Sequence, residues 1–137
     1  MNIILAQDTD ARRWDEYVSR HTDASPYHLF AWRQAAEYAY GLNSYYLIAE
    51  DPKSNIIGIL PSILINPPLL PSLMCSLPYC DRGEALADSP EITDKLISRA
   101  LEIKEETGAS KYEYRATLED DETTDTNDAS PEQNKVR

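Results

Sequence analysis

Glycine, histidine and cysteine are scarce in this 137-residue sequence, and their scarcity excludes several kinds of active site. Four glycines cannot build a glycine-rich phosphate loop, and neither Gly-x-x-x-x-Gly-Lys nor Gly-x-Gly-x-x-Gly occurs. The Gly-x-Ser-x-Gly elbow of many hydrolases is also missing. A triad could still combine Ser76 or Cys80 with His28 and Asp81. Because folding alone would have to bring that histidine to the nucleophile, we disfavour a triad.

Long apolar runs and a basic leader are missing as well. No stretch approaches the roughly 18 apolar residues that a membrane-spanning helix needs. Residues 1–5 lack the basic region that opens a secretory signal peptide. Cys75 and Cys80 have no metal-type spacing and are expected to be buried thiols in a reducing compartment. These absences predict a cytoplasmic protein without a membrane span or a metal site.

Positive charge is in short supply, since 13 Lys and Arg oppose 24 Asp and Glu for a formal net charge of -11. Such a surface repels phosphate backbones, so direct DNA binding is not expected. About half of the acidic excess lies in residues 117–137, which carry almost no large apolar groups. A segment of this composition cannot offset its ordering entropy by burial. We therefore expect one folded domain over residues 1–116 and a disordered linker or tail over residues 117–137.

Apolar patterns of strand and helix period fill the rest of the chain. Apolar runs predict five strands, at residues 3–6, 44–49, 56–65, 72–77 and 111–115. Helical spacing predicts three helices, which end before Pro26, Gly41 and Gly108. The second and third strands form an antiparallel hairpin, and Pro61 marks an edge or a bulge. The order β-α-α-β-β-β-α-β predicts an α/β (α+β) fold, a mixed sheet with flanking helices.

The most distinctive loop follows the strand at 72–77 and reads Ser76-Leu77-Pro78-Tyr79-Cys80-Asp81-Arg82-Gly83-Glu84. Loops at strand ends carry function more often than cores do. An aromatic group beside an arginine can hold a sugar or an anionic peptide. A polar crossover with a surface ion pair between Arg82 and a neighbouring acid explains the loop equally well, and its chemistry leaves both interpretations open.

Three further positions are candidates outside that loop. His28, near the start of the second helix, can donate or accept a hydrogen bond, although a lone histidine more often caps or packs. Glu113 and Arg115 share one face of the last strand, either as a solvated pair or as the lining of a cleft. Trp32 falls on the apolar face of the second helix and is predicted to lie in the core.

Five segments follow one another in a recognisable order. They are Tyr27-His28-Leu29-Phe30-Ala31-Trp32, Tyr45-Tyr46-Leu47-Ile48-Ala49, Gly58-Ile59-Leu60-Pro61, the loop from Ser76 to Gly83, and Tyr112-Glu113-Tyr114-Arg115. Together, over residues 10–116, they resemble the first half of FemAB-related acyltransferases. The closest resemblance is to the group associated with PEP-CTERM and exopolysaccharide systems.

This resemblance implies two GNAT-like subdomains, of which the chain would supply the N-terminal one. It also implies acyl or aminoacyl transfer to an amine of a cell-envelope or polysaccharide-related acceptor; Fem enzymes transfer an amino acid from aminoacyl-tRNA to a peptidoglycan precursor. The reaction needs positioned reactants, a proton acceptor and donors for the developing oxyanion. The residues expected on the substrate side are Tyr79, Asp81, Arg82, Gly83, Arg115 and His28, and no catalytic base is assigned.

Two departures from the family pattern and one missing feature of the GNAT class shape the expected activity. The loop reads Asp81-Arg82-Gly83-Glu84 where the family usually has Asp/Asn-Tyr-Gly-Gly, so the tyrosine and the second glycine are lost. GNAT enzymes hold the coenzyme A pyrophosphate in an Arg/Gln-x-x-Gly-x-Gly/Ala turn that opens a helix, and no such turn occurs. The sequence also ends at Arg137, where relatives continue into the second subdomain.

We therefore expect a truncated family member that is inactive alone and binds no cofactor itself. Its acyl donor, aminoacyl-tRNA or acyl-CoA, would need the missing half, and apolar surface left uncovered would favour self-association. Two other classes of function stay open. One is a degenerate, non-catalytic binding module, which the altered loop favours. The other is a small coenzyme A-dependent N-acetyltransferase, and the missing pyrophosphate turn argues against it.

Overall fold

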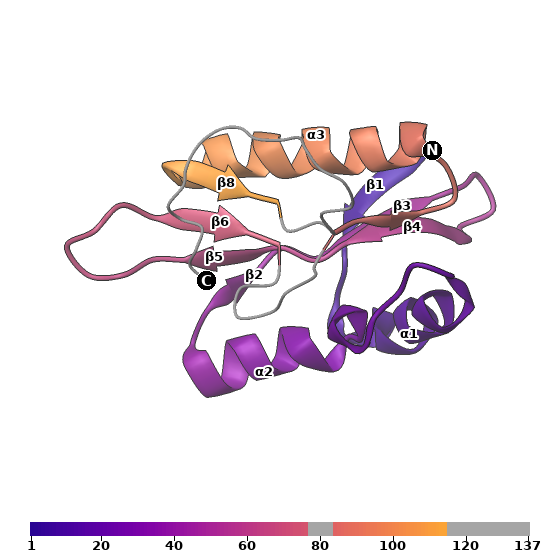
Figure 1. The fold of residues 1–137 in the computed structure, drawn as a ribbon, viewed down its shortest axis with the longest axis horizontal. Helices are drawn as coiled ribbons and strands as arrows, with labels where there is room; N and C mark the ends of the chain where they lie inside the picture. The colour runs from indigo at the N-terminus through magenta and orange to yellow at the C-terminus, as the bar shows by residue number, and fades with distance from the viewer. Residues whose placement is uncertain (77–83, 115–137) are drawn as a thin grey trace.

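Two four-stranded sheets and three α-helices make up the part of the chain that the computed structural model describes, residues 1–76 and 84–114 (Figure 1). The elements are β1 (Asn2–Leu5), η1 (Asp8–Asp10), α1 (Ala11–Arg20), η2 (Pro26–His28), α2 (Ala31–Tyr40), β2 (Asn43–Ser44), β3 (Leu47–Glu50), β4 (Ile56–Leu60), β5 (Ile63–Ile65), β6 (Leu73–Cys75), β7 (Leu86–Ala87), α3 (Pro90–Thr107) and β8 (Lys111–Glu113). The α/β class is confirmed, with helices on both sides of the strands. The predicted tail, residues 117–137, lies outside the described residues.

The sheets differ in strand direction. Sheet A has the order β1-β3-β4-β7 and is antiparallel throughout. Sheet B has the order β2-β5-β6-β8, in which β6 and β8 run parallel and the other neighbours run antiparallel. The predicted hairpin is confirmed as β3 and β4, and the mixed character is confirmed in sheet B.

Two of the predicted strands are divided between the sheets. The strand predicted at 44–49 becomes β2 and β3, and the strand predicted at 56–65 becomes β4 and β5. Pro61 stands at the second division, where its missing N–H would interrupt a ladder. The chain nevertheless stays paired there, because the Tyr45 N–H donates to the Ser62 carbonyl at 2.7 Å. We call the place where the chain crosses between sheets, at residues 45–46, 61–62, 76 and 84–85, the sheet junction.

Helices cover the two faces of this layer. Figure 1 shows α3 on one side and α1 and α2 on the other. The α3 side buries Leu96, Ala100 and Ile103 against alternate residues of β3, Leu47 and Ala49. The opposite side packs Trp14, Phe30 and Tyr46 around Ile48. Alternation along β3 therefore sends its side chains into two separate cores, as the two-residue period of a strand requires.

The predicted helix ends agree with the structure. Gly41 and Gly108 follow α2 and α3 with φ angles of 65° and 79°, the left-handed conformation that glycine adopts at low cost. Pro90 occupies the first position of α3, and the Ser89 side chain before it makes no capping hydrogen bond. Ser89 is thus a cap by position only.

The expected burial of Trp32 is wrong. Its side chain is 39% exposed, its ring lies 5.5 Å from that of Tyr27, and its indole N–H donates to the Pro26 carbonyl at 3.2 Å. α2 faces the sheet through Ala36 instead. A helical period fixes which residues share a face, but only the packing of the helix decides where the buried sector is centred.

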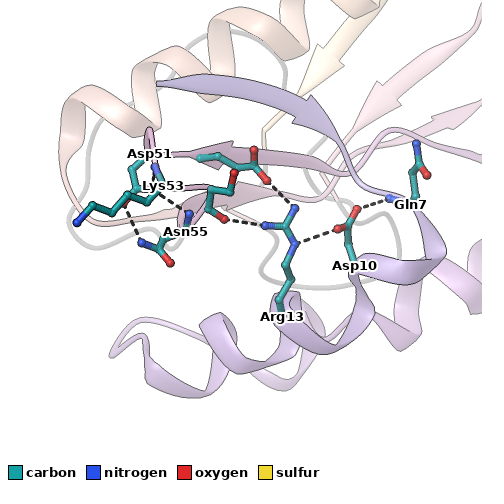
Figure 2. A network of polar contacts seen from close by, with 8 residues as sticks. Gln7, Asp10, Arg13, Asp51, Lys53 and Asn55 are labelled. Carbon is teal, nitrogen blue, oxygen red and sulfur yellow. Dashed lines mark hydrogen bonds and ion pairs between the residues drawn. The ribbon is translucent and has the colours of Figure 1, made fainter.

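One polar network ties α1 to the turn between β3 and β4 (Figure 2). The Arg13 guanidinium donates to Asp10 Oδ1 at 2.9 Å, to Glu50 Oε2 at 2.6 Å and to the Ser54 carbonyl at 3.0 Å. Asp51 holds the turn itself, because its Oδ1 accepts the backbone N–H groups of Lys53 and Asn55, each at 2.9 Å. The network fixes the outer end of the hairpin against α1.

We expect Arg13→Ala to lower the free energy of unfolding by about 1 to 2 kcal/mol, since three charge-assisted contacts are lost at a partly exposed site. Urea denaturation followed by circular dichroism measures the loss. Arg12→Ala is the matched control, because Arg12 is 92% exposed and its contact with Glu16 is 3.9 Å long. Equal losses in the two variants would contradict a structural role for the network.

Two smaller expectations concern cysteine and the membrane. Cys75 is buried, as predicted, and Cys80 lies outside the described residues. Within those residues, no helix combines the length and the apolar character needed to cross a bilayer.

Candidate active site

Buried polar side chains gather around the sheet junction. His28, Ser62 and Ser76 are the buried polar residues of residues 1–76 and 84–114, and each has no exposed surface. Ser62 and Ser76 stand where strands change sheets, and His28 approaches from η2. Polar groups buried this fully need hydrogen-bond partners, so their contacts show how the junction is held.

His28 anchors the chain just after the distinctive loop. Its Nε2 lies 2.9 Å from the Glu84 carbonyl oxygen, which can only accept, so this nitrogen carries the proton. Its Nδ1 in turn accepts the Ser25 backbone N–H at 3.1 Å. The carbonyl of His28 accepts the indole N–H of Trp14 at 2.7 Å. In this arrangement the buried imidazole positions Glu84, and its contact with a substrate stays a prediction.

Both described ends of the loop meet the last strand. The Ser76 N–H donates to the Glu113 carbonyl at 3.0 Å, and the Ala85 N–H donates to the Tyr114 hydroxyl at 2.8 Å. The predicted site residues Tyr79, Asp81, Arg82 and Gly83 lie between these ends, outside the described residues, as does Arg115. The structure therefore brings together His28, the two ends of the loop and the residue before Arg115, and leaves the other five positions as predictions.

Tyr112 of β8 and Tyr114, which directly follows that strand, both reach the junction. The Tyr112 hydroxyl lies 2.6 Å from Ser62 Oγ, and burial raises the pKa of Tyr112 well above its ordinary value. Burial likewise raises the pKa of Tyr114 to about 12. Both phenols thus stay neutral near pH 7, where they can donate a hydrogen bond but are poor proton acceptors. Ser62 was not predicted as a site residue. Its position after a proline, inside an apolar run, is a signal that could have identified it as a buried polar group.

The raised pKa of Tyr114 predicts a loss of stability in alkaline solution. A group whose pKa is higher in the folded state than in the unfolded state stabilises the fold below the unfolded value, near 10. That contribution, on the order of 3 kcal/mol, is lost as the pH rises from about 10 to about 12. Chemical denaturation at pH 9, 10 and 11 should show the decline, and Tyr114→Phe should reduce it. An unchanged decline in that variant would contradict the assignment.

The opening of α3 follows the junction directly, and its residues do not fit an anion. Pro90 has no N–H to offer, and the amides of Ile92 and Thr93 donate to the Ser89 carbonyl at 3.2 and 3.3 Å. Acidic Asp88 and Glu91 flank the first turn. A helix N-terminus binds phosphate through free amides and positive potential, and this one offers little of either.

Among the described residues, no three or more His, Cys, Asp or Glu side chains are grouped so that they could hold a metal ion. What the junction can supply is a pair of neutral phenols and a set of backbone groups fixed by buried contacts. These groups can orient a ligand and donate hydrogen bonds to it. No general base is assigned among them.

Comparison with known proteins shows which solved structures share this fold. No protein-family model and no curated protein matches the sequence. Among solved structures, FemX is similar with a TM-score of 0.60 and 18% identity over 80% of this chain and 25% of that chain. Glucosamine-6-phosphate N-acetyltransferase from Arabidopsis thaliana also has a TM-score of 0.60, with 12% identity over 93% of this chain and 97% of that one.

A third similar structure is ribosomal-protein-alanine N-acetyltransferase from Brucella melitensis biovar Abortus 2308, with a TM-score of 0.58 and 15% identity over 85% of this chain and 81% of that one. At these identities the likeness concerns the fold alone. The chain therefore has a GNAT-like fold, as the resemblance implied, and its assignment to the FemAB-related group stays a prediction.

Proposed function

We propose that this chain forms one wall of an acyl-transfer site in a FemAB-like transferase. In the reaction, an amine of a cell-envelope or polysaccharide-related acceptor attacks an activated acyl or aminoacyl carbon. The observation that carries the proposal is the sheet junction, where His28, both ends of the 76–84 loop and Tyr114 meet. The GNAT-like fold, shared with several acetyltransferases, supports transfer chemistry in general.

Tyr114 is the described residue best suited to a direct part in transfer. Its oxygen accepts the Ala85 N–H at 2.8 Å, so its own proton can be donated elsewhere. With a pKa of about 12 it stays protonated at neutral pH. Such a phenol can donate a hydrogen bond to the bound acceptor, and it can stabilise negative charge developing on a carbonyl oxygen during transfer. We assign Tyr79, Asp81, Arg82, Gly83 and Arg115 to binding of the acceptor.

The acyl donor is proposed to bind elsewhere than at α3. Pro90, Glu91 and the engaged amides of the first turn fit a pyrophosphate poorly, so coenzyme A lacks the helix terminus that GNAT enzymes use. The similarity to FemX covers only a quarter of that chain, which leaves room in a FemX-sized protein for a second unit. We therefore expect this chain alone to transfer nothing, with or without acetyl-CoA.

A small coenzyme A-dependent N-acetyltransferase is the second candidate. The observation in its favour is the match to glucosamine-6-phosphate N-acetyltransferase, which extends over 97% of that enzyme. Isothermal titration of the full chain with acetyl-CoA distinguishes the two. Binding at micromolar concentration would establish the second candidate and overturn the first.

A non-catalytic binding module is the third candidate. It is favoured by the junction contacts themselves, because His28 Nε2 and the Tyr112 hydroxyl are both used inside the protein. This candidate predicts acceptor binding that does not depend on the phenol proton of Tyr114.

The experiment that tests the first proposal uses an amine-bearing peptidoglycan precursor, a UDP-N-acetylmuramyl pentapeptide, as the probe for the purified full chain. Calorimetry should detect binding that Arg82→Ala abolishes and Tyr114→Phe weakens by about tenfold, the equivalent of one lost hydrogen bond to a charged group. Tyr38→Phe is the matched control, because Tyr38 is 75% exposed on α2.

Two results would count against the proposal. Binding that survives Arg82→Ala would remove the loop from the site. An unchanged affinity in Tyr114→Phe would remove the phenol and favour the non-catalytic module.

A further inference from the structure

β7 has little strand pairing of its own. It contains two residues, Leu86 and Ala87, and it pairs with β4 at the edge of sheet A. Strands usually have about five or six residues, so two ladder positions attach a segment weakly. β7 nevertheless carries Leu86 into the core on the α1 side, where this side chain has no exposed surface. Contacts from outside sheet A must therefore help to hold residues 84–88 in place.

His21, the residue after α1, holds one end of this segment. Its Nε2 lies 3.0 Å from the Ala87 carbonyl oxygen, and its Nδ1 accepts the Asp23 backbone N–H at 3.1 Å. A carbonyl oxygen only accepts and a backbone N–H only donates, so the ring is neutral with its proton on Nε2. The Nδ1 contact orients the ring toward Ala87. A proton added to Nδ1 would meet the Asp23 N–H donor to donor, and the ring would have to turn away from both partners.

His28 holds the other end of the segment through the same pattern. Its Nε2 donates to the Glu84 carbonyl at 2.9 Å, and its Nδ1 accepts the Ser25 backbone N–H at 3.1 Å. The Ser25 hydroxyl lies 3.1 Å from Nδ1 and can accept a proton from it, whereas the Ser25 N–H cannot. His28 has no exposed surface, so burial also opposes a charged ring. Both imidazoles thus keep all of these contacts only while they are neutral.

The charged groups around His21 act in opposite directions. The Asp88 carboxylate accepts the Tyr17 hydroxyl at 2.8 Å, and burial raises the pKa of Tyr17, so this phenol stays neutral. The Arg20 guanidinium lies 5.5 Å from the centre of the Tyr17 ring, which is 5.7 Å from the imidazole. Asp88 and Asp23 attract a charged imidazole and Arg20 repels it. None of these charges removes the conflict between a protonated Nδ1 and the Asp23 N–H.

Acidic groups face His28 from two elements. α1 contributes Asp15, whose carboxylate accepts the backbone N–H just before α2 at 2.8 Å, and the segment contributes Glu84 itself. Tyr114 stays neutral, because burial raises its pKa to about 12. Both acids attract a charged imidazole, yet that attraction leaves a backbone N–H facing Nδ1.

We propose that His21 and His28 form a pH-dependent latch on residues 84–88, which holds the segment while both imidazoles are neutral and releases it when they are protonated. Histidine ordinarily takes up its second ring proton as the pH falls through about 6.5. The latched form binds fewer protons than the released form, so its stability is present above that pH and is lost below it. Release would also break the contact between the Ala85 N–H and the Tyr114 hydroxyl in the sheet junction. The latch is independent of the proposed function.

Native-state hydrogen exchange of the full chain, followed by NMR, measures this release. The Asp88 N–H, which donates to the Ile57 carbonyl at 3.0 Å, reports the opening of the segment. After correction for the intrinsic exchange rate, the ratio of released to latched protein should rise by up to about a hundredfold per pH unit between pH 6 and 5, since two protons are taken up. His21→Gln keeps an N–H donor but cannot be protonated, so the rise should fall to about tenfold per pH unit.

Two controls separate a latch from general acid unfolding. Nitrogen-15 NMR of the rings at pH 8 should find both protons on Nε2, and the amides of β3, an interior strand of sheet A, should stay protected while Asp88 loses protection. A proton on Nδ1 of either ring would overturn the proposal, and so would a rise that His21→Gln leaves unchanged. Loss of protection in β3 in step with Asp88 would show unfolding of the whole domain and would overturn it as well.

Discussion

Trp14→Ala should lower the free energy of unfolding by about 3 to 5 kcal/mol, the range for removing a large buried aromatic side chain. Trp14 has no exposed surface, and its ring lies 5.5 Å from that of Phe30 and 4.9 Å from that of Tyr46. The substitution also leaves the His28 carbonyl without its indole donor. Since small domains are stable by only about 5 to 15 kcal/mol, a loss of this size would unfold much of the protein at 37 °C.

The matched control is Trp32→Ala, because Trp32 is 39% exposed and packs mainly on Tyr27. Its expected loss is about 1 kcal/mol or less. Trp14→Phe separates the two parts of the effect, since it keeps an aromatic ring and removes the hydrogen bond to His28. Urea denaturation of the three variants provides the comparison. Similar losses for Trp14→Ala and Trp32→Ala would contradict the placement of Trp14 in the core and of Trp32 at the surface.

Gly58→Ala should cost about 1 to 3 kcal/mol, the range for overpacking a filled interior. A Cβ at this position in β4 would lie 2.6 Å from Ile92 Cγ2 and 3.1 Å from Leu96 Cδ1, both on α3. The Ile92 methyl is attached directly to a β-branched carbon in a helix, so it cannot rotate away freely. α3 would have to move off sheet A, and Gly58→Val should be worse still.

A double-mutant cycle checks the cause of that loss. If contact with Ile92 is responsible, Ile92→Ala should recover part of the stability of Gly58→Ala, although it destabilises the wild-type protein. The expected coupling is about 1 kcal/mol in the favourable direction. Additive losses would contradict a steric conflict between β4 and α3.

The positions of the helices and of most strands could be predicted because their signals are local. Gly41 and Gly108 end helices through their own backbone conformation, and the apolar stripe of α3 has an unbroken helical period. The division of strands between sheets could not be predicted in the same way. Apolar residues continue through Pro61 without a change of pattern, and only the fold decides that the pairing partner changes there. The two-residue strand β7 was missed because it is too short to have a period.

In the candidate site, too, the local features could be predicted and the long-range contacts could not. The loop was identified from its residue types and from its place at the end of a strand. The burial of His28 and its contact with Glu84 join residues 56 positions apart, a relation that no local pattern contains. The prediction that Trp32 is core failed for a similar reason, because α2 turns Ala36 rather than Trp32 toward the sheet.

The parallel pairing of β6 with β8 has a consequence for the order of assembly. Its partners, such as Met74 and Tyr112, are separated by the whole of α3, whereas β1, β3 and β4 all lie within the first 60 residues. During synthesis sheet A can therefore begin to form early, whereas the edge of β6 stays unpaired until β8 has been synthesised. Long-range parallel pairing of this kind is slow and leaves an open edge in the nascent chain. Folding of sheet B should accordingly be the rate-limiting step, and a holding chaperone should act in that interval.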